Sequence, residues 1–163
     1  MELKDKARED AINVLEEQIA KVSQAYYDGY MQAYKEIAAL PVEENGVTYI
    51  DLGLPSGTLW NMDILTTNDD FPMHLCLPHG KAQVLNLPTQ EQIDELFSIC
   101  QVLTYNSNIK VTGPNGNTID LPKREFWVKN SNVSEFKGMT FDPYNNKYLQ
   151  SYTGNSKNIV LVK

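Results

Sequence analysis

The sequence has few cysteines, no long apolar run and no cluster of basic residues. Only Cys76 and Cys100 occur among 163 residues, which is too few for a disulfide framework, so both are expected to be free thiols. No apolar run approaches the roughly 20 residues that a membrane-spanning helix needs. Because the net charge is −7 and no basic stripe could neutralise phosphates, nucleic acids and anionic membranes are excluded as partners.

Signals for export and for common catalytic chemistry are missing as well. The N-terminal stretch MELKDKARED lacks the apolar segment of a signal peptide, which predicts synthesis in the cytosol. There is no glycine-rich phosphate loop and no G-x-S-x-G motif. The carboxylate pairs Glu43-Glu44 and Asp69-Asp70 are adjacent in sequence, so their side chains point apart and indicate solvated charge. We therefore expect neither catalysis nor a cofactor.

Residues 1–40 contain no proline, and their apolar residues recur at helical spacing. The intervals alternate between 3 and 4, with one additional 4 across Gly29, which is typical of a heptad seam with a stutter. The sequence therefore predicts one long helix with an apolar seam. The seam residues expected to mediate oligomerisation are Ile12, Leu15, Ile19, Val22, Tyr26, Tyr30 and Ile37.

Two interpretations of this helix are open. It is either an amphipathic helix that lies on its own domain, or a coiled coil or helical bundle between chains. A helix of this length spans roughly 58 Å, which exceeds the width of a domain of about 120 residues. Part of it should then project with its seam uncovered. We therefore favour self-association into a homo-oligomer, although the seam does not fix the number of chains.

The remainder of the chain has the pattern of an α+β domain at residues 47–163, preceded by a linker at residues 41–46 that ends in an Asn-Gly turn. Residues 62–86 are expected to be irregular. A helix should start at Thr89, with Gln92 completing a capping box. β-Branched and aromatic runs predict strands at residues 47–52, 58–60, 109–112, 118–121, 126–128, 138–141 and 159–162, and near Tyr148; the third and fourth flank a turn and should form a hairpin.

Three blocks of this domain are distinctive as strings: Tyr49–Trp60 (YIDLGLPSGTLW), Leu87–Leu96 (LPTQEQIDEL) and Val111–Pro122 (VTGPNGNTIDLP). In this order they resemble the opening, the helix start and the hairpin of the Fibrobacter succinogenes major paralogous domain, a family abundant in Bacteroidetes. Phe126-Trp127 and residues 159–163 stand where that family has an aromatic pair and a final strand. The resemblance covers residues 46–163 and none of the N-terminal helix.

The resemblance implies a fold similar to C-type lectins and formylglycine-generating enzymes, in which a twisted antiparallel sheet and one main helix support variable loops that usually serve binding. The family's Gly- and Trp-rich insert is mostly replaced here by residues 61–86. The Glu-Pro-Asn and Gln-Pro-Asp motifs of calcium-dependent animal lectins are absent. A formylglycine-type enzyme needs a reactive cysteine pair, and neither Cys76 nor Cys100 lies in a matching motif, which disfavours that alternative.

Two groups of residues are candidates for binding. His74, Cys76 and His79 carry metal-ligating side chains, but only Cys100 remains as a further soft ligand, so we favour an ordinary loop and expect no metal. The second group combines tyrosine and tryptophan rings, which stack on sugars, with asparagine amides. Alternatively, its tyrosines are half-buried sheet residues and its asparagines turn residues. Its members are Trp127, Tyr144, Asn145, Asn146, Tyr148 and Tyr152.

Together these features predict a non-enzymatic display or adhesion module that is multimerised by its helix, so that weak single contacts gain avidity. The expected setting is a phage virion that infects a Bacteroidetes host. There the protein would be a decoration or fibre component, with the helix on the particle scaffold and the other domain on surface glycans or on a protein. The alternative is a purely structural assembly protein that has no soluble ligand.

Overall fold

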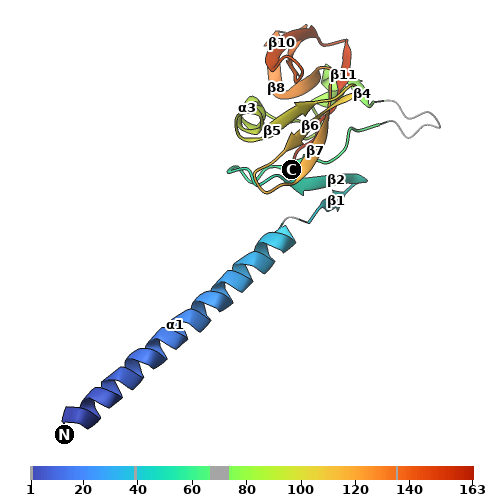
Figure 1. Cartoon of the computed structure of the whole chain (residues 1–163). Helices are drawn as coiled ribbons and strands as arrows, with labels where there is room; N and C mark the ends of the chain where they lie inside the picture. The colour runs from blue at the N-terminus through green and yellow to red at the C-terminus, as the bar shows by residue number, and fades with distance from the viewer. Residues whose placement is uncertain (1, 39, 67–73, 135) are drawn as a thin grey trace. The chain divides into compact units, whose positions relative to one another are not determined.

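The chain forms two compact units, Met1–Ala38 and Ala39–Lys163. The computed structural model describes residues 2–38, 40–66, 74–134 and 136–163, so the carboxylate pair Asp69-Asp70 lies outside the described residues. The first unit is helical, and the second, called the head from here on, carries the sheets (Figure 1). The protein is therefore α+β with mostly antiparallel sheets, as predicted.

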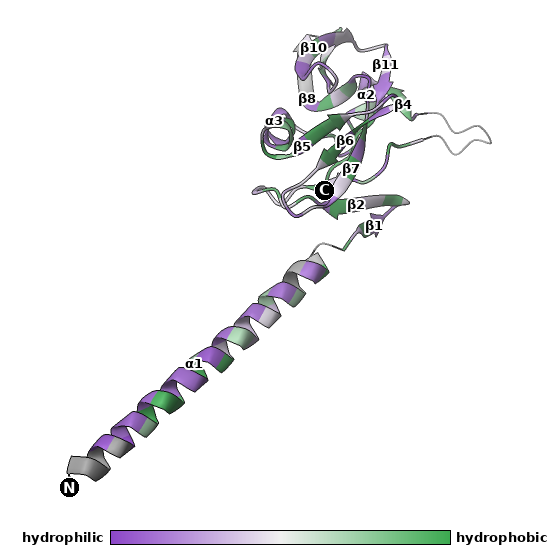
Figure 2. Ribbon diagram, in the orientation of Figure 1, coloured by the Kyte–Doolittle hydropathy of each residue, from purple (hydrophilic) through white to green (hydrophobic). Residues whose placement is uncertain are grey.

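Helix α1 covers Glu2–Ala38, which confirms the helix expected from the proline-free N-terminal region. Lys21 and Glu17 form an ion pair of 2.7 Å one turn apart on its surface. The seven expected seam side chains are 47–78 % exposed, and Figure 2 shows hydrophobic residues recurring among hydrophilic ones along α1. The seam thus leaves large apolar side chains in water unless another surface covers them. None of the helices in the described part of the chain has an apolar stretch long enough to cross a membrane.

The first sheet of the head has the order β1-β2-β3, and both of its pairings are antiparallel. Its strands are β1 (Val42–Glu44), β2 (Val47–Asp51) and β3 (Leu59–Asn61). The prediction of a linker at residues 41–46 is wrong in part, because β1 lies within it. Asn45 and Gly46, with φ angles of 51° and 75°, form the tight turn that pairs β1 with β2.

The second sheet, also antiparallel, has the order β5-β6-β7, and the helix α3 precedes it in the chain. Its strands are β5 (Gln101–Thr104), β6 (Asn108–Thr112) and β7 (Thr118–Pro122), and the last two confirm the predicted hairpin. Helix α3 covers Gln90–Ile99. The Thr89 hydroxyl accepts the Gln92 N–H at 3.4 Å, and the Gln92 side chain accepts the Thr89 N–H at 2.9 Å. The predicted capping box is therefore confirmed.

The third sheet has the order β10-β9-β8-β11-β4 and is antiparallel except for the β11–β8 pair. Its strands are β4 (Cys76–Pro78), β8 (Phe126–Ser134), β9 (Lys137–Asp142), β10 (Lys147–Tyr152) and β11 (Ser156–Asn158). Residues 62–86, expected to be irregular, contain β4 and the short helix α2 (His79–Ala82). The prediction missed β4 because a strand of three residues shows no periodicity of its own and is fixed by its pairing with the distant β11.

The expected final strand at residues 159–162 is not a regular strand. The Asn61 N–H donates to the Leu161 carbonyl at 3.1 Å, but the Leu161 N–H donates to the Asn61 side-chain oxygen at 2.7 Å. Because a side chain takes the place of one backbone acceptor, the ladder with β3 is interrupted. Only the bridge between Trp60 and Val162 is formed among the described residues of this segment.

Two apolar clusters form the core of the head, and α3 packs on the larger one with Ile93 and Leu96. Burying one large apolar side chain contributes about 1.5–3 kcal/mol, so these clusters account for much of the stability of the head. The largest fully buried side chains are Trp60, Phe126 and Phe141 in the first cluster and Trp127 in the second.

The three distinctive sequence blocks contact one another in the head. From the hairpin, the Asn115 side-chain amide donates to the Asp51 carbonyl of the first block at 2.9 Å. From α3, the Gln92 side chain donates to the Thr58 hydroxyl, also in the first block, at 3.2 Å. The blocks that are most recognisable in the sequence therefore form one connected part of the fold.

Gly113→Ala is expected to lower the free energy of unfolding by about 1–3 kcal/mol. Gly113 is buried where the hairpin meets the first block, and a Cβ atom there would overlap the Leu52 carbonyl group. Gly80→Ala is the matched control, because open space surrounds Gly80 and its backbone is not left-handed. Urea denaturation of both variants measures the difference, and equal stabilities would contradict this packing.

Candidate ligand pocket

A polar pocket of about 520 Å³ lies at one end of the third sheet, where β9 ends and β8 begins. A neighbouring hollow of about 670 Å³ shares Cys76, Lys123, Arg124 and Asn158 with this pocket, so the two adjoin. Several strand ends therefore contribute to a single depression. The pocket is lined by Cys76, Lys123, Arg124, Glu125, Asp142, Tyr144, Asn145, Ser156, Lys157 and Asn158.

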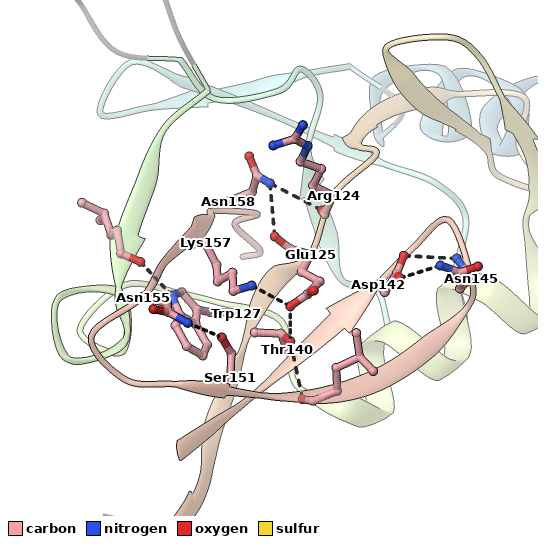
Figure 3. A network of polar contacts seen from close by, with 12 residues as sticks. Arg124, Glu125, Trp127, Thr140, Asp142, Asn145, Ser151, Asn155, Lys157 and Asn158 are labelled. Atoms are coloured by element: carbon pink, nitrogen blue, oxygen red, sulfur yellow. Dashed lines mark hydrogen bonds and ion pairs between the residues drawn. The ribbon is translucent and has the colours of Figure 1, made fainter. Parts of the chain in front are cut away.

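Glu125 organises the wall of the pocket. Its carboxylate accepts a hydrogen bond from the Thr140 hydroxyl and pairs with Lys157, both at 2.9 Å (Figure 3). The Asn158 side-chain amide donates to the Glu125 carbonyl at 3.1 Å, and the Cys76 thiol donates to the Asn158 side-chain oxygen at 3.6 Å. These contacts join the start of β8 to β9, β11 and β4. The negative charge of Glu125 is thus compensated within the wall itself.

The turn between β9 and β10 supplies another part of the lining. The Asp142 carboxylate accepts the Asn145 side-chain amide at 2.7 Å and the backbone N–H groups of Tyr144 and Asn145 at 3.0 and 3.1 Å. Burial raises the pKa of Asp142, but these hydrogen bonds outweigh burial and hold the pKa below its ordinary value. Asn146 adopts a φ of 49°, a conformation that asparagine tolerates in turns.

Two cations of the pocket form no salt bridge with any residue that the structure describes. Lys123 places its Nζ 4.7 Å from the centre of the Tyr144 ring and 3.4 Å from the Tyr105 carbonyl oxygen. The exposed guanidinium group of Arg124 has no hydrogen-bond partner among the described residues, and no dashed contact reaches it in Figure 3. The pocket lining therefore contains a guanidinium group, an ammonium group and an aromatic ring, and neither cation has a salt-bridge partner among the described residues.

The residues predicted to bind a ligand do not lie together. Tyr144 and Asn145 line the pocket. Tyr152 is 62 % exposed but lies on β10 outside the pocket lining, with the Lys137 ammonium 5.4 Å from its ring centre. Tyr148 is half-buried and donates to the Asp94 carboxylate at 2.7 Å; burial, and then this carboxylate, raise the pKa of its hydroxyl. Tyr148 is therefore a half-buried sheet residue and Asn146 a turn residue, as in the alternative interpretation of this group.

Trp127 is a core residue, so the expectation that it lies on a ligand-binding surface is corrected. Its side chain is fully buried, and its Nε1–H donates to the Leu77 carbonyl at 2.7 Å (Figure 3). Its ring also packs edge-on against His79, with the ring centres 4.9 Å apart. An aromatic pair at the start of a strand places one ring on each face, and here both faces of β8 are covered.

Sequence reasoning missed the charged residues of the pocket, namely Lys123, Arg124, Glu125, Asp142 and Lys157. One signal could have indicated them. Lys123-Arg124 is an adjacent basic pair that directly follows the hairpin block in a chain with a net charge of −7. The partners of Glu125 on other strands carry no such signal, because only folding brings them to it.

The histidines and cysteines of the suspected metal cluster are separated by their environments. His74 is exposed and lines the neighbouring hollow, whereas His79 is buried against Trp127. Cys100 packs against the larger apolar cluster. Cys76 and Cys100 are both free thiols, and burial raises the pKa of each. Within the described ranges, no three histidine, cysteine or acidic side chains gather as a metal site.

His79 should make the head less stable below neutral pH. Burial lowers the pKa of its imidazole from an ordinary value of 6.5, and its Nε2 has no hydrogen-bond partner among the described residues. The His79 imidazole therefore takes up a proton more readily in the unfolded chain than in the folded one. The free energy of unfolding falls as the pH drops below about 6.5. Urea denaturation at neutral and mildly acidic pH should show this loss, and His79→Phe should reduce it.

The exposed His74 provides the matched control, because His74→Phe makes the same chemical change at a side chain on the surface. This variant should keep the pH dependence of the original chain. An unchanged pH dependence in His79→Phe would mean that other groups cause the loss.

Comparison with protein-family models, with curated proteins and with solved structures found no match to this chain. The resemblance of residues 46–163 to the Fibrobacter succinogenes major paralogous domain therefore stays a prediction.

Proposed function

We propose that this chain is a non-enzymatic binding protein, in which the helix assembles several copies and the head, similar to a C-type lectin-like domain, binds a ligand in its pocket. The pocket carries this proposal, because its hydrogen-bonded wall combines an exposed aromatic ring at Tyr144 with the Arg124 guanidinium group, which has no hydrogen-bond partner among the described residues. Antiparallel sheets, one main helix and loop-borne polar groups agree with a lectin-like head. The exposed seam of α1 supports self-association.

Multimerisation would make weak single contacts useful. Linked copies bind a repetitive surface with an avidity that exceeds the single-site affinity, provided that several heads engage at once. A bacterial surface coated with glycans is such a surface. We propose that the protein acts in adhesion to surface glycans or to a surface protein, as a decoration or fibre component of a phage virion that infects a Bacteroidetes host. The resemblance of the head to a Bacteroidetes domain family supports this setting.

The test uses the full chain in its assembled form on a glycan array and on cells of Bacteroidetes species. Binding should be retained by the assembled chain and should weaken strongly in a variant that no longer self-associates, since avidity is then lost. If neither glycans nor cells retain the assembled protein, the adhesion function is wrong.

A structural assembly protein without a soluble ligand is the second candidate, and the exposed seam of α1 favours it, because a seam alone suffices for docking into a particle. The head is a compact unit with its own core, so it is expected to fold when residues 1–38 are removed. A head that binds cells or glycans is a recognition domain. A head that binds only the assembled particle is a structural component.

A further inference from the structure

We infer that the pocket at the end of the third sheet recognises a saccharide that bears a carboxylate group; this rests on the proposed binding function and adds the chemical class of the ligand. The charges of the pocket, its aromatic ring and its size each point to this class.

The charge balance of the lining leaves two cations for a ligand. Glu125 is compensated by Lys157 at 2.9 Å, and Asp142 is held by the hydrogen bonds of its own turn. Arg124 and Lys123 remain without a carboxylate partner among the described residues. A guanidinium group matches a carboxylate with two parallel hydrogen bonds, a geometry that neutral sugars do not offer.

The positive charge is local, which separates this pocket from a general polyanion surface. The whole chain carries a net charge of −7, so a long polyanion that extends beyond the pocket meets net repulsion from the rest of the chain. A small ligand with one acidic group avoids that repulsion. The site therefore favours a single carboxylate placed against Arg124 over a run of phosphates or sulfates.

The ring and amide groups beside the cations suit the rest of a sugar. Tyr144 is 55 % exposed, so its face can pack on the C–H face of a pyranose ring. Asn145 and Ser156 offer polar groups for sugar hydroxyls at the same pocket. The volume of about 520 Å³ falls within the range of small-molecule sites and accommodates one or two sugar units.

The experiment measures binding of the full chain to oligosaccharides of galacturonate, glucuronate and sialate by isothermal titration calorimetry. The methyl ester of each oligosaccharide is the matched ligand, because esterification removes the charge and keeps the sugar. At least one acid should bind about tenfold or more tightly than its ester, since a hydrogen-bonded charge pair is lost. Added salt should lower the affinity for the acid more than the affinity for the ester, because salt screens the charge pair.

Variants locate this binding in the pocket. Arg124→Gln should lower the affinity for the acidic sugar about tenfold or more and leave the affinity for the ester unchanged. Arg124→Lys should lower the affinity for the acid less than Arg124→Gln does, because it keeps the positive charge but loses the two parallel N–H donors of the guanidinium group. Lys81→Gln is the control, since Lys81 is exposed and does not line the pocket. If Arg124→Gln does not fold, the comparison of acids with their esters still tests whether the ligand's carboxylate contributes to binding.

Equal affinities for acids and esters would overturn the carboxylate preference while the binding function stands, and so would binding of neutral glycans alone. Polyglutamate that competes as well as the acidic sugars would overturn the saccharide class. If no glycan or cell is bound by the assembled chain, the proposed function fails together with this inference.

Discussion

Leu15→Asp is expected to convert the assembled chain into monomers in solution. Leu15 is the second residue of the apolar seam and is 60 % exposed on α1, so an assembly through this seam would bury it against other copies. Each buried leucine contributes about 1.5–3 kcal/mol per copy, and a charge in the same place adds a desolvation cost. Sedimentation velocity of the original chain and of the Leu15→Asp variant at equal concentration measures the change in the mass of the assembly.

Val14→Asp is the matched control, because Val14 is also a large apolar side chain, 56 % exposed, but lies next to the seam rather than in it. It should leave the mass unchanged, and the circular dichroism of both variants reports whether α1 stays helical. A monomeric original chain, or loss of assembly in both variants, would show that the seam does not join copies. The helix would then bury its seam elsewhere.

The sequence predicted best those elements whose signals are local. The capping box of α3 needs only Thr89 and Gln92, three positions apart, and both reciprocal hydrogen bonds are present. The hairpin of β6 and β7 needs only a turn between two β-branched runs, and its register pairs Thr112 with Thr118. In each case the residues that determine the structure are neighbours in the chain.

The predictions failed where the determining partner is distant in sequence. Strand β4 exists because Asn158 lies opposite Cys76, a pairing across most of the head that no pattern around Cys76 reveals. The expected strand at residues 159–162 has the right apolar run, but the side chain of Asn61 takes one of its backbone hydrogen bonds. The local sequence does not show whether such a segment pairs as a regular strand.

The candidate site was predictable in part for the same reason. Tyr144 and Asn145 stand in a turn rich in tyrosine and asparagine, and composition alone indicated a surface role for them. Arg124 became a candidate only when folding placed Lys157 on Glu125 and left the guanidinium group without a carboxylate partner among the described residues. Which of several charges is free for a ligand is a property of the fold.

Trp127→Phe is expected to lower the free energy of unfolding by about 2–4 kcal/mol. The change removes part of a fully buried ring and leaves the Leu77 carbonyl, which accepts the Trp127 Nε1–H at 2.7 Å, without that donor. Ligand affinity should stay unchanged under conditions where the variant is folded, because Trp127 does not line the pocket. A loss of affinity at unchanged stability would restore Trp127 as a ligand contact.

Trp60→Phe is the matched comparison for the same change of side chain. Trp60 is buried to the same extent, but its Nε1–H has no hydrogen-bond partner within the described part of the chain. The substitution therefore removes a buried unsatisfied donor along with the ring volume, and the two effects oppose each other. We expect Trp60→Phe to be less destabilising than Trp127→Phe by about 2 kcal/mol. Urea denaturation of the two variants gives this difference directly, and equal losses would mean that the Trp127–Leu77 hydrogen bond contributes nothing to stability.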